Sequence, residues 1–149
     1  MKKFMGMLAM CFALTLAFLP TISKADSSPP LRSVSISAVG DNNKMYSASS
    51  YLTIPVLKGD YLYVKVSEVG TPDSYSEALT VNGVRYAGSS LDEVSSYTGP
   101  FGSEKTFRLR IKDSYIFSNT PNSTNTIAFE ARVPFSMQVL SKSISVHVE

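Results

Sequence analysis

The chain has 149 residues, and its 14 Lys and Arg against 12 Asp and Glu give a formal net charge of +2 at pH 7. Such a small positive excess can neutralise few phosphates, which argues against nucleic acid as the main partner. The single cysteine excludes a disulfide within the chain.

The first 25 residues have the pattern of a secretory signal peptide. Two lysines follow the initial methionine, residues 4–19 carry no charge, and Ala25 is the small residue expected before a cleavage site. The alternative is a membrane anchor, but an anchor needs about 20 apolar residues. Cys11 does not end the apolar run, as a lipidated cysteine would. We expect cleavage before Asp26 and a secreted, extracellular protein.

Cleavage would remove three lysines and leave 11 basic and 12 acidic residues, for a net charge near −1. Residues 26–30, an aspartate followed by serines and prolines, are predicted to form a flexible lead-in to a single domain over residues 31–149. This domain contains no second apolar run that is long enough to span a membrane. At its size, a domain buries about two-thirds of its unfolded surface, so a core can hold it without disulfides.

Hydrophobic residues of the domain repeat with a period of two, which is typical of strands with one buried face. In the first run, for example, Val34, Ile36 and Ala38 share a face opposite three serines. Alternation of this kind predicts strands at residues 33–39, 51–56, 60–66, 107–113, 126–133 and 143–149. Pro55 has no N–H to donate, which predicts that its strand lies at a sheet edge.

The stretch ALTVNGVRY, residues 78–86, predicts two further short strands joined by a tight turn. Asn82 and Gly83 both tolerate the positive φ angles of a type I′ turn, whose twist matches that of the strands it joins. A second turn is predicted at residues 57–60, between the Pro55 strand and the next strand.

Seven to eight short strands within about 115 residues indicate an all-β domain. Because a single sheet would leave one apolar face in water, we predict an antiparallel β-sandwich of immunoglobulin-like plan. The sequence after residue 25 has no cysteine and no tryptophan, so the Cys–Trp–Cys core of true immunoglobulin domains is absent. A small closed β-barrel is the alternative.

The runs SVSISAVG, GDYLYVKVSEVG, LTVNGVRY and FSMQVLSKSISVHV together resemble a family of small secreted bacterial all-β proteins of unassigned function. The resemblance spans most of residues 31–148. It implies export and the all-β fold, and it implies no catalytic residue. Residues 89–104 have no counterpart in it.

Candidate catalytic and metal-binding residues are few. The only histidine, His147, lies near the end of the last strand, where an exposed position is the simplest interpretation. A His-based zinc site lacks ligands. Residues 40–44 and 71–77 contain oxygen ligands but not the spacing of a calcium loop, so we predict turns there. No cofactor and no metal are expected.

Paired carboxylates are the remaining catalytic option, because two of them across a groove can hydrolyse a glycosidic bond. The acidic residues concerned lie in or near predicted loops: Glu68, Asp73, Glu77, Asp92 and Glu93. We interpret them as solvated loop charges.

Two rows of outward side chains are the main candidates for binding. Tyr61, Tyr63 and Lys65 form one row, and Arg108, Arg110 and Lys112 form the other. Tyrosine offers a flat apolar body with a polar tip to sugars or proteins, and a row of cations suits an anionic polymer. Structural roles are the alternative, through strand propensity and pairing with Glu130.

The predicted loops at residues 70–77 and 87–104 are rich in Ser, Gly and Tyr, as adaptable contact loops are. Within the second loop, residues 95–103 are the first choice for a recognition loop, anchored by Tyr97 and Phe101. Plain connection between strands is the alternative.

These observations predict a non-enzymatic protein that acts by binding a polysaccharide, a wall polymer or another protein. The alternative is a small secreted effector with antimicrobial, inhibitory or membrane activity. An enzyme ranks below both. The sequence leaves the ligand and the oligomeric state open.

Overall fold

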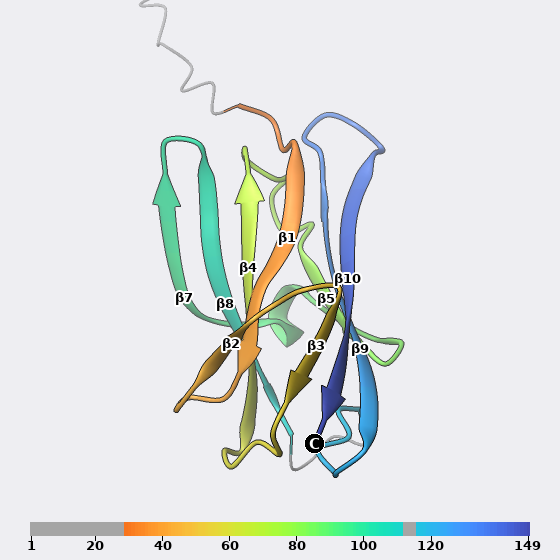
Figure 1. The fold of residues 1–149 in the computed structure, drawn as a ribbon. Helices are drawn as coiled ribbons and strands as arrows, with labels where there is room; N and C mark the ends of the chain where they lie inside the picture. The colour runs from red at the N-terminus through yellow and green to blue at the C-terminus, as the bar shows by residue number, and fades with distance from the viewer. Residues whose placement is uncertain (1–28, 112–115) are drawn as a thin grey trace, which may run out of the picture.

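The computed structural model describes residues 29–111 and 116–149. The predicted signal peptide, most of the lead-in and Lys112 lie outside these residues. Two five-stranded sheets pack face to face (Figure 1). None of the helices in the described ranges is long and apolar enough to cross a membrane.

The first sheet has the strand order β2-β1-β4-β8-β7, and its strands are antiparallel. The strands are β1 (Ser33–Gly40), β2 (Met45–Ser47), β4 (Tyr61–Val69), β7 (Asp92–Gly99) and β8 (Gly102–Arg110).

The second sheet has the order β3-β10-β9-β5-β6, and a short 3-10 helix, η1, follows β6. Its elements are β3 (Tyr51–Ile54), β5 (Ala78–Val81), β6 (Val84–Ala87), η1 (Gly88–Ser90), β9 (Ser123–Arg132) and β10 (Val139–Val148). The edge position predicted for the strand before Pro55 is confirmed, because β3 ends the sheet. Its pairing with β10 is parallel, so the sandwich is mostly rather than wholly antiparallel.

The immunoglobulin-like β-sandwich is confirmed, and the closed barrel is excluded because the two sheets remain separate. The order β1-β4-β8-β7 corresponds to strands A, B, E and D of an immunoglobulin domain, and β10-β9-β5-β6 to G, F, C and C′. Loops 70–77, 100–101 and 133–138 therefore meet at one end of the sandwich, at the top of Figure 1, and Glu149 lies at the other.

Aliphatic and aromatic side chains from both inner faces form the core. Leu62 and Val64 of β4 and Val146 of β10 are fully buried. Phe107 of the first sheet and Phe129 of the second stack with ring centroids 5.9 Å apart. The predicted alternation therefore places the apolar face of each sheet against the other.

The Asn82-Gly83 hairpin is confirmed, with φ angles of 47° and 87° at these two residues. Asn82 also ties the hairpin to the sheet. Its Nδ2 donates to Asn125 Oδ1 at 2.8 Å, and its Oδ1 accepts from the Thr126 N–H at 2.7 Å. Asn125 is fully buried, so the first of these bonds satisfies an oxygen that water does not reach.

The predicted count of seven to eight strands is wrong, because the described residues form ten. Sequence patterning missed β2, which has three residues, and β7. Every side chain of β7 before Gly99 is exposed, so neither face of the strand shows apolar alternation. The predicted loop at residues 87–104 therefore contains β7, and residues 95–103 form part of the β7–β8 hairpin.

The predicted faces of the first strand also need a correction. Val34 and Ile36 are buried as expected, but a register shift between Ile36 and Ala38 places Val39 in the core instead of Ala38. A bulge of this kind inserts one residue and reverses the alternation beyond it.

Candidate functional site

Two regions of the molecule are candidate sites, and the first lies on the outer face of the first sheet. In the β4–β8 register, Tyr61 pairs with Arg110 and Tyr63 pairs with Arg108. Paired residues on antiparallel strands point to the same side of a sheet. The two predicted rows therefore share one surface, here called the tyrosine–arginine face: Tyr61, Tyr63 and Lys65 of β4 with Arg108 and Arg110 of β8.

Carboxylates pair with two of the cations on this face. Arg108 Nε lies 2.6 Å from Asp92 Oδ2, and Lys65 Nζ lies 2.6 Å from Glu104 Oε1. The Arg108 guanidinium also lies over the Tyr61 ring, 5.0 Å from its centroid. The predicted alternative partner, Glu130, instead binds Arg85 on the other sheet.

The two remaining predicted residues differ in position. Tyr97 of β7 pairs with Glu104 of β8, which places it on the same outer face, with 70% of its surface exposed. Phe101 lies in the β7–β8 turn and is 79% exposed. Tyr97 thus extends the tyrosine–arginine face, whereas Phe101 belongs to the end of the sandwich.

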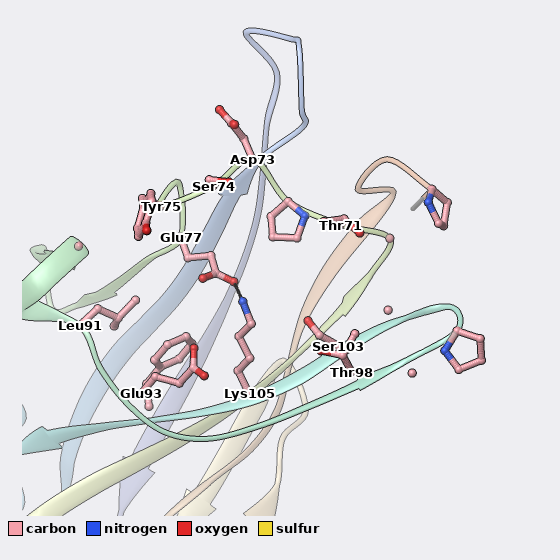
Figure 2. Close-up of a pocket in the computed structure, with 18 residues that line it drawn as sticks. Thr71, Asp73, Ser74, Tyr75, Glu77, Leu91, Glu93, Thr98, Ser103 and Lys105 are labelled. Atoms are coloured by element: carbon pink, nitrogen blue, oxygen red, sulfur yellow. Dashed lines mark hydrogen bonds and ion pairs between the residues drawn. The ribbon is translucent and has the colours of Figure 1, made fainter. Parts of the chain in front are cut away.

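The second candidate is a cavity of about 530 Å³ at the loop end of the sandwich, here called the end pocket (Figure 2). Loop 70–77 forms one wall, and the inner faces of β7 and β8 form the other. Polar side chains line much of it, among them Asp73, Glu77, Glu93, Thr98, Ser103 and Lys105. Leu91 and Phe107 supply apolar lining.

Lys105 lies at the centre of the polar groups in this pocket. Its Nζ forms an ion pair with Glu77 Oε1, drawn in Figure 2, and lies 3.6 Å from Glu68 Oε2. Ser103 Oγ donates a hydrogen bond of 2.7 Å to the same Glu68 oxygen. Because Ser103 and Lys105 both line the cavity, Glu68 lies directly behind its wall.

The interpretation of Glu68 as a solvated loop charge is wrong. It belongs to β4, its side chain is fully buried, and its Oε1 has no hydrogen-bond partner among the described residues. Burial raises the pKa of this carboxyl group to about 7, and the nearby Glu77 carboxylate acts in the same direction. The Ser103 hydrogen bond and the Lys105 charge oppose the rise.

A signal for this site was present in the sequence. The alternation that places Leu62, Val64 and Val66 inward continues to Glu68, so the pattern itself directs a carboxylate to the buried face. The same periodicity places Lys105 on the face of Phe107. An ionisable residue in register with a buried row indicates either a polar network or a pocket.

The other predicted sites have structural surroundings. His147 stacks on Tyr51, and its Nδ1 lies 3.2 Å from Thr124 Oγ1. Asp41 accepts from the N–H groups of Asn43 and Lys44, as predicted for a turn. Although burial alone would raise the pKa of Asp41, these backbone hydrogen bonds outweigh it and lower the pKa. In the part of the chain that the structure describes, no group of three His, Cys, Asp or Glu residues could hold a metal ion.

The comparisons with known proteins found one weak structural similarity. No family model and no curated protein match the chain. Among solved structures, it is similar to an endo-β-1,4-mannanase from Thermotoga petrophila, with 10% identity and a TM-score of 0.46. That similarity covers 85% of this chain but only 21% of the mannanase chain. At this level, the similarity carries no argument about fold or function.

Proposed function

We propose that this is a secreted, non-enzymatic binding protein whose tyrosine–arginine face binds an uncharged polysaccharide. The observation that carries the proposal is the β4–β8 register, which brings two tyrosines, two arginines and a lysine onto one strand pair. Tyrosine rings pack against the C–H faces of sugars, and charged side chains nearby exchange hydrogen bonds with hydroxyl groups.

The pairing of charges favours an uncharged polymer over an anionic one. Asp92 binds Arg108, and Glu104 binds Lys65. Together, the three described cations of the face and these two carboxylates have a net charge of only about +1. An anionic wall polymer needs unpaired positive charge, whereas a neutral polymer needs donors and acceptors in fixed positions. The ion pairs on this face hold such donors and acceptors in place.

The signal-peptide pattern of residues 1–25 supports export. Mass spectrometry of the protein recovered from the growth medium should find an N-terminus at Asp26. Recovery of the uncleaved chain in the membrane fraction would contradict this part of the proposal.

The binding surface is tested by affinity electrophoresis through gels that contain a neutral polysaccharide, for example a mannan, a β-glucan or a xylan. At least one polymer should retard the native protein, and Y61A/Y63A should abolish the retardation. Two stacking rings contribute enough binding energy that their loss should weaken binding at least tenfold.

Tyr51→Ala is the matched control, because Tyr51 is an exposed tyrosine on the second sheet. Its variant should migrate like the native protein. If no neutral polymer retards the protein while an anionic one does, the proposed ligand class is wrong. If Tyr51→Ala and Y61A/Y63A behave alike, the proposed surface is wrong.

A second function, that of a membrane-active effector, has one observation in its favour. Four large apolar side chains in the loops at one end are strongly exposed: Tyr75, Phe101, Phe135 and Met137. Apolar loop tips of this kind can enter a lipid surface or contact a partner. Co-sedimentation with lipid vesicles, lost in F135S/M137S, would support this function, and the absence of co-sedimentation would remove it.

A further inference from the structure

The end pocket combines a cavity with a strong imbalance of charge. Three carboxylates line it, those of Asp73, Glu77 and Glu93, and Lys105 is the one basic residue among the described residues of its lining. Arg132 approaches Asp73 from outside the lining, at 3.9 Å between Nη1 and Oδ2. The interior therefore carries a net negative charge even after Lys105 has paired with Glu77.

The buried carboxyl group of Glu68 lies behind the wall of the pocket. Its partners Ser103 and Lys105 both line the cavity, and its Oε1 has no hydrogen-bond partner among the described residues. Glu68 itself does not line the cavity, so it adds a buried acidic group directly behind the wall that Ser103 and Lys105 form.

The behaviour of Lys105 shows which kind of group this environment stabilises. Its side chain is only 17% exposed, and burial by itself would lower its pKa. The hydrogen bond to Glu77 and the negative charges of Glu68, Glu77 and Glu93 outweigh that effect and raise the pKa. The carboxylates around the cavity therefore stabilise an ammonium group that is largely removed from water.

The arrangement of the carboxylates distinguishes an organic cation from a metal ion. A metal site needs several ligands within a short distance of one point, and the described residues contain no such group. Here the acidic residues line a cavity of about 530 Å³ together with the apolar Leu91 and Phe107. That space accommodates an alkyl chain with a charged end better than it does a bare ion.

We propose that the end pocket binds an organic cation, a primary ammonium or guanidinium group on an aliphatic chain. The cation would lie beside Glu93, near the Glu77–Lys105 ion pair, and its aliphatic chain would contact Leu91 and the exposed Tyr75 at the entrance. A lysine or arginine side chain of a peptide and a free diamine offer the same chemistry. This site is separate from the tyrosine–arginine face, since the lining strands present the opposite side of the sheet.

The test is a titration of the purified protein followed by amide NMR at pH 7.5 and low salt. The probes are acetyl-Gly-Lys-Gly-amide, the same peptide with an acetylated lysine side chain, and cadaverine. The lysine peptide or cadaverine should give saturable shifts in residues 71–77 and 98–105. The acetylated peptide, which lacks the charge, should give none. Binding of cadaverine without the peptide would identify a free amine as the source of the cation.

Glu93→Gln removes one lining carboxylate without changing its shape, and it should weaken binding about fivefold. Asp73→Asn is a second variant, at an exposed site where folding is not at risk. Glu149→Gln, the same substitution at the opposite end of the sandwich, is the matched control and should bind as the native protein does.

Equal binding of the charged and acetylated peptides would overturn the proposal, as would shifts confined to other regions. Unchanged affinity in both Glu93→Gln and Asp73→Asn would overturn it as well. Because the polysaccharide assay probes the other side of the sheet, failure of one proposal leaves the other intact.

Discussion

The inner face of the first sheet has two regions that come from the same strands. In the central region, Val64 of β4 and Phe107 of β8 are buried against the second sheet. Toward the loop end, β4 presents Glu68 and β8 presents Lys105, and the facing wall is loop 70–77 in place of a strand. Both regions belong to the same strands, but the second sheet packs against one region and loop 70–77 faces the other.

The difference shows what hydrophobic alternation reports. It reports burial against an opposing apolar surface, and where that surface ends the same face can carry ionisable groups. β7 lies at the edge of the first sheet, and its side chains before Gly99 are exposed. The pocket occupies the space beside its inner face. Substitutions in the two regions should therefore differ in the size of their effect and in its dependence on pH.

The largest effect is expected in the covered region. Phe129→Ala removes a fully buried ring that stacks on Phe107 across the two sheets. The cavity should lower the free energy of unfolding by about 3–5 kcal/mol. Urea denaturation measures this change. Phe101→Ala, at an exposed ring in the turn between β7 and β8, is the control and should stay within about 0.5 kcal/mol of the native protein. Similar losses of stability in both variants would contradict the proposed difference between the buried and the exposed ring.

An intermediate effect is expected from pH at the junction of the two regions. The pKa of Glu68 is about 7 in the folded protein against an ordinary value of 4.5. Between these values the folded state keeps a proton that the unfolded state has lost. The free energy of unfolding should therefore fall as pH rises from 4.5 to 7, by about 2–3 kcal/mol from this group.

Glu68→Gln isolates that contribution, because glutamine has the shape of the protonated acid and does not ionise. Urea denaturation of both proteins at several pH values gives two stability curves. The difference between the curves should grow across this interval and become constant about one pH unit above 7. Parallel curves would show that Glu68 ionises as an exposed carboxylate does.

The smallest effect on stability is expected at the pocket wall that β7 forms. Thr98 lies on β7, lines the cavity and is exposed. Thr98→Ala should change the free energy of unfolding by less than about 0.5 kcal/mol. Val64→Ala is the informative comparison, since Val64 is fully buried on the same sheet, and it should cost several times more. A large loss at Thr98 would show that β7 is packed against an unrecognised partner segment.

Most of the fold could be predicted because a strand that buries one face against the other sheet has apolar residues at alternate positions of its sequence. The Asn82-Gly83 hairpin, the edge position of the strand before Pro55 and the buried row of β4 all followed from local patterns. β7 could not be predicted in this way, because a strand exposed on both faces has no apolar period. The bulge between Ile36 and Ala38 could not be predicted either, since one inserted residue changes the register without changing the composition.

The candidate sites were predicted unevenly. The residue types of the tyrosine–arginine face were found from the sequence, but their meeting on one surface depends on the register of β4 with β8. The end pocket was missed, although alternation assigned Glu68 to the inner face, because apparent loop charges were assumed to be solvated. No pattern within one strand shows whether the facing sheet extends far enough to cover it.

The sequence by itself determined the two apolar faces, the turns between the strands and hence the sandwich, because burial of alternating side chains is a local property of each strand. Only the tertiary structure decided which strands are neighbours, where one sheet stops covering the other and which charges meet across that gap. These features depend on contacts between residues far apart in the chain. Glu68 reaches Lys105 only because β4 and β8 pair in one particular register.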